Sequence, residues 1–444
     1  MENKKKNLGA ISFLPLIIFL VLYVGCGLVF TLKGAEDPFT KLPRHVALLA
    51  GCAVALLLNR NMKVKDKLDV MTTNMGNSGV MMIVLIYLMA GGFQGIASAM
   101  GGKESVVNLC LSFIPVRFLI PGVFLMCCLI STSIGTSMGT IAAMAPIAVS
   151  VAQGAHLNIA IVGAAVIGGS YFGDNLSMIS DTTISAAEGC GSEMKDKFKM
   201  NFFIALPAAI VAVVLYSVIG GTGSGSIEVG SYNVIEVLPY LIVLITALLG
   251  INVAVVLFIG MLSAGVIGMC FGHYGFFELV QGIGDGMSDM FSISMVAILV
   301  SGIIGLVREY GGIEWLVGAI SSKIKSRRGA EYGIGLMSGI LSAAMINNTI
   351  AIIITCPIAK EIGAKYNIAP KRLASLVDIF ACAFISLMPH DGGMLMITAL
   401  ADVSPLSVLK YSFYMFGLII ATCITIQFGL LEDKSVSKET AEEA

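Results

Sequence analysis

The chain has few charged residues for its length of 444 residues. Asp, Glu, Lys and Arg make up 12% of it and hydrophobic residues 57%, whereas an average soluble domain is roughly 25% charged. This composition excludes a water-soluble globule and favours an all-α membrane protein in contact with the lipid bilayer. The net charge is -1. Since the sequence has no basic stripe with interleaved aromatic residues, we expect no nucleic-acid partner.

Motifs for several kinds of chemistry are also missing from the sequence. It has no Walker motif, no nucleophile triad and no metal-ligand spacing, so neither an ATP-driven pump nor an enzyme is indicated and no cofactor is expected. The ten cysteines include no CxxC pair. Nearly all of them lie inside apolar runs, where cysteine is a small packing residue in a reduced compartment.

Long apolar runs dominate the chain and predict about ten transmembrane helices. Two further apolar regions, 118–154 and 331–364, are each divided by a polar Gly/Ser/Thr/Asn cluster. Each arm has roughly 15 residues, which suits a re-entrant hairpin better than a full span. The ten predicted spans are 9–32, 44–58, 78–99, 157–187, 201–220, 234–249, 252–271, 286–307, 373–402 and 410–431.

The basic residues predict how the chain is oriented in the membrane. With ten crossings and a cytoplasmic N-terminus, 21 of the 27 Lys and Arg residues fall inside. This asymmetry is the bias expected of inner-membrane proteins, so we expect a multi-pass inner-membrane protein with both termini in the cytoplasm. The six basic residues assigned to the outside are Lys33, Lys41, Arg44, Lys103, Arg117 and Lys410.

The two halves of the chain match when Pro146 is aligned with Pro357, an offset of 211 residues. Thr136-Ser137 then faces Asn347-Asn348, and the hairpins coincide. Five crossings per half is an odd number, so the second copy must be inverted. The predicted organisation is a first repeat at 1–220 with a broken helix at 157–187, a linker at 221–232, a second repeat at 233–431 with a broken helix at 373–402, and a cytoplasmic tail at 432–444.

Polar residues gather at both predicted hairpin tips. Helix ends at such tips leave backbone amides and carbonyls unpaired, and these groups bind an anion or a dehydrated sodium ion. The alternative is close helix packing through small residues. The candidate residues are Ser133, Gly135, Thr136 and Ser137 at the first tip and Asn347, Asn348 and Thr349 at the second.

The two predicted broken helices carry carboxyl groups. An Asp at bilayer depth costs roughly 2.5–3.5 kcal/mol, so it needs a function. Burial favours the protonated form of a carboxyl group and a nearby cation favours the carboxylate, so a proton and sodium compete for the same group. Alternatively, Asp181 caps a helix and His390 closes a structural hydrogen bond. The candidates are Asp174, Asn175, Ser177, Ser180, Asp181 and Thr182 at the first break and His390 and Asp391 at the second.

Other charged residues give weaker signals. Asp378 is a further candidate to face the helix bundle from the last broken helix. The run from Lys195 to Lys199, together with Glu188 and Glu193, is typical of an ordinary solvated loop.

Two motifs give the sequence a family resemblance. Gly-Thr-Ser-Met-Gly-Thr at 135–140 and Tyr-Phe-Gly-Asp-Asn-Leu-Ser-Met-Ile-Ser-Asp-Thr-Thr at 171–183 resemble the NhaC-type Na⁺/H⁺ antiporter family, over about residues 12–430. The wider ion transporter superfamily includes sodium/dicarboxylate symporters, whose Ser-Asn-Thr tips are similar to the tip at 347–349. The resemblance implies sodium as coupling ion, alternating access of an elevator or rocking form, and a homodimer.

Residues and resemblance together predict a sodium-coupled secondary transporter. The first hypothesis is Na⁺/H⁺ antiport, with Na⁺ near Asp174, Asp181, Thr136 and Asn348. The alternative is sodium-coupled symport or exchange of a small amino acid or organic carboxylate, whose anionic group the hairpin-tip amides would hold. A channel is less favoured, because paired broken hairpins suit occlusion better than an open pore.

Overall fold

The computed structural model describes residues 7–33, 41–113, 115–178, 180–220, 231–249, 251–345 and 347–431. In these ranges every regular element is a helix, which confirms the predicted all-α class. Most of the predicted linker, at 221–230, and the whole predicted tail at 432–444 lie outside the described residues.

We call α1–α5 and α11–α15 the outer helices. Asparagines begin two of them, because the Asn77 and Asn252 side chains accept hydrogen bonds from the backbone amides of Gly79 and Ala254. Their bounds are η1 Gly9–Phe13, α1 Leu14–Leu32, α2 Arg44–Leu57, α3 Val64–Met75, α4 Ser78–Ala99, α5 Gly102–Phe113, α11 Val234–Leu248, α12 Val253–Cys270, α13 Phe276–Asp289, α14 Phe291–Glu309 and α15 Gly312–Ser321.

We call α6–α10 and α16–α21 the core helices, because their sides facing one another bury most of the polar side chains discussed below. Their bounds are η2 Val116–Phe118, α6 Leu119–Ile134, α7 Ser137–Gly154, α8 Ile159–Leu176, α9 Asp181–Cys190, α10 Met194–Ile219, α16 Arg327–Met345, α17 Asn348–Lys365, α18 Pro370–Ser386, α19 Gly392–Ala401, α20 Pro405–Leu409 and α21 Phe413–Phe428.

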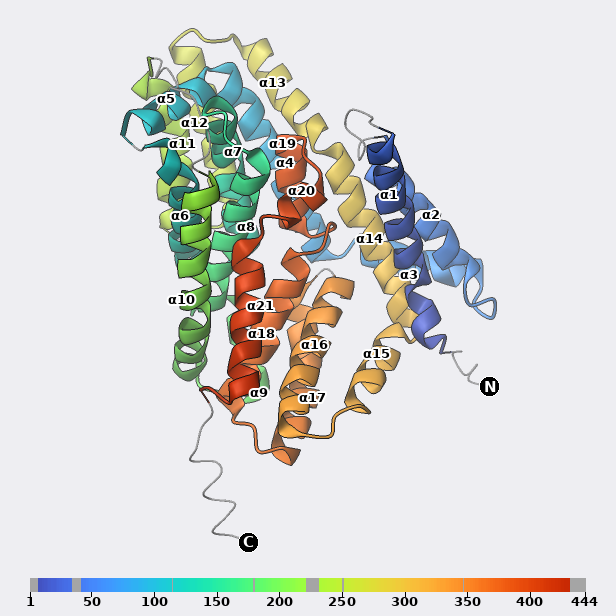
Figure 1. The fold of residues 1–444 in the computed structure, drawn as a ribbon. Coiled ribbons are helices and arrows are strands. Elements are labelled where there is room, and N and C mark those ends of the chain that lie inside the picture. The colour runs from blue at the N-terminus through green and yellow to red at the C-terminus, as the bar shows by residue number, and fades with distance from the viewer. Residues whose placement is uncertain are drawn as a thin grey trace.

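Segments far apart in the sequence lie side by side in both groups (Figure 1). In the core, α6 packs on α8, α16 on α18, α10 on α21 and α17 on α9. In the outer group, α4 packs on α13 and α14 packs on α2 and α3. The two groups meet where α7 and α19 approach α4, α12 and α14. The α6–α7 pair lies in the upper half of Figure 1 and the α16–α17 pair in the lower half.

Among the described residues, seven helices are long and apolar enough to cross a membrane. They lie at Gly9–Gly27, Ser78–Ala99, Val116–Ser133, Ser137–Gly154, Ile159–Leu176, Met194–Ile219 and Phe291–Glu309. Several other predicted spans are apolar helices of 10–17 residues, including α2 and α21. The hairpin arms have 16 and 18 residues in α6 and α7, and 19 and 18 in α16 and α17. They are longer than the roughly 15 residues expected, because the helices extend into the polar clusters. Both arms of the first predicted hairpin, Val116–Ser133 and Ser137–Gly154, are therefore long and apolar enough to cross a membrane.

Matching positions 211 residues apart have the same local structure. Thr136 and Asn347 both precede the second helix of a pair, and each side chain accepts a hydrogen bond from a backbone amide three residues later. Ser180 and Asp391 occupy the N-cap positions of α9 and α19. A proline lies inside both α7 and α17.

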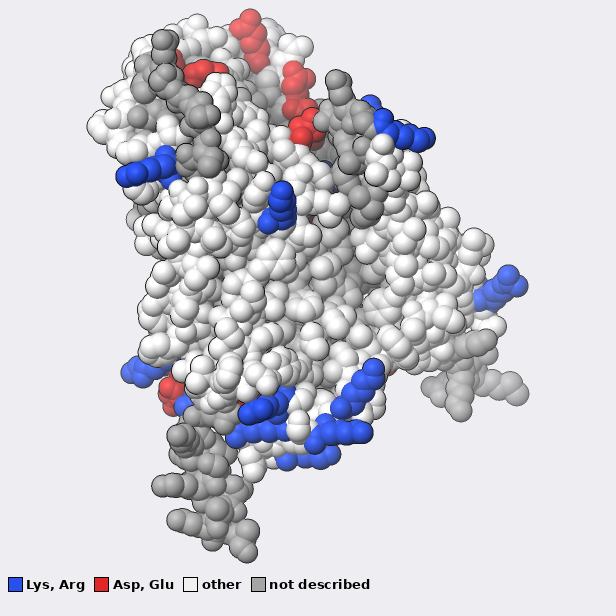
Figure 2. All heavy atoms as spheres, viewed as in Figure 1, with Lys and Arg blue, Asp and Glu red and all other residues white. Residues whose placement is uncertain are grey.

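Charged side chains are unevenly distributed over the surface. Figure 2 shows basic side chains gathered along the lower edge of this face, over the ends of α16 and α17, and acidic side chains at the upper end. α1 begins and α21 ends in the lower part of the same view (Figure 1). Most of the face between the two ends carries no charged side chains, as a lipid-facing surface requires.

Candidate functional site

The turn between α6 and α7 places small polar groups against α8. Gly135 ends α6 with a φ of +77°, a left-handed conformation that favours glycine. Thr136 then starts α7, and its hydroxyl accepts a hydrogen bond from the Gly139 amide. The buried Ser131 hydroxyl donates to the carbonyl of Ser170, which fixes α6 against α8. As a result, Ser137 faces the end of α8.

Asp174 is the centre of the first helix break. Its carboxylate is 2% exposed and lies in the last turn of α8, just before the chain leaves helical geometry. Ser137 donates to Oδ2 over 2.8 Å, and Ser180, from the far side of the break, donates to Oδ1. The Ser180 hydroxyl also lies 2.8 Å from the Thr182 hydroxyl. Two interrupted segments therefore supply hydroxyl groups to one buried carboxylate.

A buried ion pair lies next to this carboxylate. Lys197, in the first turn of α10, and Asp378, in α18, are both 0% exposed, with Nζ and Oδ2 2.6 Å apart. The Lys197 ammonium also donates to the Thr183 hydroxyl at 2.6 Å and to the Asn175 carbonyl at 3.1 Å. Asn201, one turn further along α10, donates to Asp378 at 2.9 Å and to the same carbonyl. The ion pair thus holds α10 and α18 on the broken end of α8.

The prediction of a solvated loop at 195–199 is wrong for Lys197. Lys195 and Lys199 are exposed, but the helix begins at Met194, so Lys197 and Asn201 lie one turn apart on the same buried face. This i, i+4 spacing was the signal available in the sequence. It was missed because the predicted span began at 201, after the lysine.

The charges in this cluster leave one carboxylate without a counter-charge. Lys197 balances Asp378, and no basic side chain contacts Asp174 among the described residues. Asn201 Oδ1 is buried and has no hydrogen-bond partner in the described part of the chain, so it is an additional acceptor. A site with a surplus negative charge and neutral oxygen atoms suits one monovalent hard cation or one proton.

The second break, between α18 and α19, has a different set of contacts. Asp391 Oδ2 accepts the Met394 amide and so caps α19, while Oδ1 accepts the Tyr171 hydroxyl of α8 at 3.2 Å. His390 Nε2 lies 2.9 Å from the carbonyl of Ala343 in α16. This contact favours the structural alternative for His390, because it fixes the break to the second hairpin.

One residue of the second predicted hairpin tip contacts the first break. Thr349 donates its hydroxyl to Asp181 over 2.6 Å, on the exposed side of the break. The Asn348 amide lies 3.6 Å from Cys382 Sγ in α18, and Asn347 caps α17. The N-cap position of α9 belongs to Ser180, so Asp181 is the first helical residue rather than the cap.

The predicted site residues therefore separate into groups. The structure brings Ser137, Asp174, Ser180 and Thr182 into direct contact, with Asn175 and Ser177 buried in the same break. Asp181 pairs with Thr349, and Asp391 pairs with Tyr171. Ser133 lies apart, since its hydroxyl donates back to the Leu129 carbonyl.

Comparisons with known proteins match nearly the whole chain. The malate-2H⁺/Na⁺-lactate antiporter of Bacillus subtilis is 22% identical, over 94% of this chain and 96% of the relative. The Na⁺/H⁺ antiporter NhaC of the same species is 25% identical, over 97% and 100%. The arginine/ornithine antiporter ArcD of Halobacterium salinarum is 23% identical, over 83% and 81%. The model of the Na⁺/H⁺ antiporter family matches residues 8–221 and 227–432, and the chain belongs to this family.

Proposed function

We propose that the protein is a membrane carrier that exchanges Na⁺ for H⁺ at Asp174. The single observation that carries the proposal is the buried Asp174 carboxylate, which accepts hydroxyl hydrogen bonds from Ser137 and Ser180 and has no basic partner among the described residues. An unpaired charge in this environment is unstable, so the group holds either a proton or a cation. One site that takes either ion, but not both, is what coupled exchange requires.

The surrounding residues have distinct roles in this mechanism. Hydroxyls at Ser137, Ser180 and Thr182 supply neutral oxygen atoms to a dehydrated Na⁺, and they turn to donate when the carboxylate is free. The Lys197–Asp378 pair keeps the neighbouring carboxylate neutralised, so that a single ion balances the site. Sodium is the transported coupling ion here, and no resident cofactor is needed.

Alternating access would come from two inverted halves with re-entrant hairpins. Support comes from the matching N-cap positions 211 residues apart at Thr136 and Asn347 and at Ser180 and Asp391. It also comes from the placement of the α6–α7 and α16–α17 pairs in opposite halves of Figure 1. In this arrangement, one hairpin reaches the site from each side of the inner membrane, and the basic edge of Figure 2 faces the cytoplasm.

Liposomes that contain the purified protein and a pH-sensitive dye test this proposal. An imposed sodium gradient should drive proton flux in the opposite direction, and Asp174→Asn should abolish it. An interaction with a charged, hydrogen-bonding ligand contributes about 1.5–3 kcal/mol to binding. Its loss should weaken the affinity for sodium by roughly 10- to 100-fold. Because the substitution removes an unpaired buried charge, the variant should unfold at the same or a higher temperature.

The matched control is Asp69→Asn, which removes a carboxylate of the same kind from the exposed face of α3. This variant should retain the full proton flux. The proposal is rejected if the unaltered protein gives no proton flux under a sodium gradient.

A second candidate function is sodium-coupled symport or exchange of a small amino acid or organic carboxylate. It is favoured by two relatives named as a malate/lactate antiporter and an arginine/ornithine antiporter. Uptake of labelled solutes from a panel, with and without sodium, separates it from simple ion exchange.

A further inference from the structure

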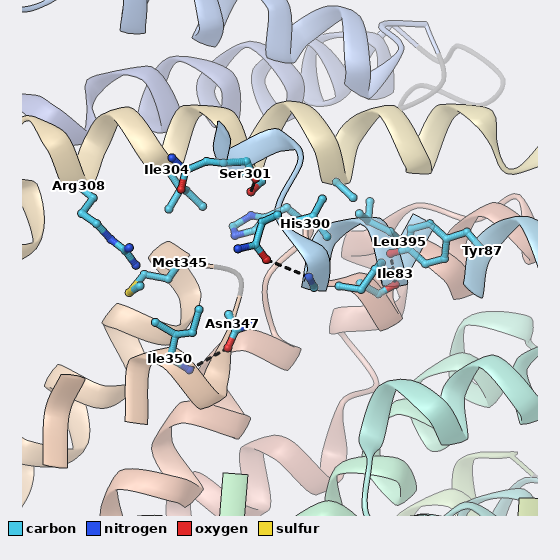
Figure 3. A pocket seen from close by; sticks show the side chains of 16 residues that line it. Ile83, Tyr87, Ser301, Ile304, Arg308, Met345, Asn347, Ile350, His390 and Leu395 are labelled. Atoms are coloured by element: carbon cyan, nitrogen blue, oxygen red, sulfur yellow. Dashed lines mark hydrogen bonds between the residues drawn. The ribbon is translucent and has the colours of Figure 1, made fainter. Parts of the chain in front are cut away.

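A cavity of about 130 Å³ lies between the outer and the core helices, away from the Asp174 carboxylate. Figure 3 shows it bounded by α14 and the α3–α4 connection on one side, and by the second hairpin tip and the start of α19 on the other. A solute there would contact both groups of helices at once.

The charge of the cavity has one sign. Of the 16 residues that line it, Arg308 at the end of α14 is basic and none is Asp or Glu. The guanidinium group reaches from α14 toward Met345 and has no hydrogen-bond or ion-pair partner among the described residues. The Arg308 side chain is exposed, and an arginine without an ion-pair partner among the described residues is a counter-charge for an anion.

Amide groups add further donors to this lining. Asn77 and Asn347 each use the side-chain oxygen to accept a backbone amide, from Gly79 and Ile350. Within the described residues, the NH₂ groups of both side chains have no acceptor. Both NH₂ groups are therefore available as donors to a solute in the cavity, and Asn77 is exposed at its edge, while Ser301 already donates to the Asn74 carbonyl.

The remaining walls are apolar. Side chains such as Ile83, Ile304, Ile350 and Leu395 cover the part of the cavity beyond the polar groups (Figure 3). Arg308 is the one Lys or Arg side chain among the described residues of the lining and balances one negative charge, and a second carboxylate placed against the apolar walls would have no counter-charge. The lining matches a short aliphatic body with one carboxylate.

We infer that this cavity binds a small organic monocarboxylate, with its anionic group on Arg308 and on the amides of Asn77 and Asn347. The inference rests on the proposed role as a sodium-coupled carrier. It gives a binding site to the organic carboxylate of the second candidate function. The α18–α19 break, whose His390 and Gly392 line the cavity, also carries Asp391, so the anion lies beside a helix that contacts the ion-binding core.

Calorimetric titration of the purified full chain with lactate tests the inference. Lactate should bind saturably, and propionamide, a neutral molecule of similar size, should bind at least about tenfold more weakly, because it lacks the charged hydrogen bonds. Arg308→Gln should weaken lactate binding by at least about tenfold, and Arg308→Lys should weaken it less. Lys325→Gln, an exposed cation outside the cavity, should leave binding unchanged.

Equal binding of lactate and propionamide to the unaltered protein would overturn the inference, and this comparison needs no variant that has to fold. Inorganic phosphate that binds as tightly as lactate would also overturn it, in favour of a phosphate or a lipid headgroup. Sodium-driven proton flux is measured on the same preparations. Intact flux without lactate binding rejects only this inference, whereas lactate binding without any flux rejects only the Na⁺/H⁺ exchange.

Discussion

At the scale of the residue, two buried carboxylates in one cluster differ in their partners. Asp378 has an ammonium group at 2.6 Å, whereas Asp174 has only hydroxyl donors among the described residues. This difference supports the proposed ion-binding role of Asp174, whereas the charge of Asp378 is balanced by Lys197. A second buried pair, Arg372 and Glu331, lies at 2.9 Å between α18 and α16. It offers a comparison with the pair at the site.

Lys197→Met should destabilise the protein by about 3–5 kcal/mol, because it leaves Asp378 charged and unpaired in the core. The double substitution Lys197→Met with Asp378→Leu should recover most of that stability but not sodium-driven proton flux. Unfolding in detergent and flux in liposomes measure the two effects.

The control is the double substitution Arg372→Met with Glu331→Leu at the other buried pair. Relative to Arg372→Met alone, it should recover both the stability and the sodium-driven proton flux. If the double variant at Lys197 and Asp378 transports normally, the pair is structural only.

At the scale of the element, the site depends on close contact between α6 and α8. A Cβ atom at Gly173 would lie 2.4 Å from the Cβ of Ser131 and 2.5 Å from the backbone nitrogen of Thr132. Only glycine at 173 allows α6 to approach the end of α8, where Asp174 follows. The first hairpin is thereby held in the position from which Ser137 donates to the carboxylate.

Gly173→Ala should therefore move α6 away from α8. We expect a loss of about 1–3 kcal/mol in stability and a weaker affinity for sodium, measured by thermal unfolding at increasing sodium concentrations. The control is Gly122→Ala, which lies in α6 and has no atom within 4 Å of the added Cβ. It should lower neither the stability nor the affinity for sodium. Equal effects of the two substitutions would contradict the close-contact argument.

The elements could be predicted from the sequence more completely than the contacts between them. Polar runs inside apolar segments indicated both breaks and both tips, since such runs favour an interruption of the helix. The Lys197–Asp378 pair could not be predicted, because it joins two helices from opposite halves and the lysine lies in a charged run. Arg308 was missed for a similar reason, since its cavity is formed by segments from both halves.

At the scale of the whole molecule, basic side chains gather at one end of the core and acidic side chains at the opposite end of the outer helices (Figure 2). The largely uncharged face between them has the character of a surface in contact with lipid. In the orientation proposed above, the basic edge faces the cytoplasm. The exposed residues Lys325, after α15, and Lys410, after α20, fall on opposite sides of the membrane in this orientation.

Cysteines introduced at these two positions test the orientation in intact cells. A membrane-impermeant thiol reagent should label Lys410→Cys from outside and Lys325→Cys only after the membrane is opened. Cys270, an exposed native cysteine, is replaced by serine in both variants. Labelling of Lys325→Cys in intact cells would reverse the proposed orientation.

The most direct test of the account is the binding of radioactive ²²Na⁺ to the purified protein at several pH values. The account predicts saturable binding that falls as the pH is lowered, because protons compete for the Asp174 carboxylate. It also predicts that binding is lost in Asp174→Asn and kept in Asp69→Asn. Sodium binding by Asp174→Asn with the affinity of the unaltered protein would contradict the central claim.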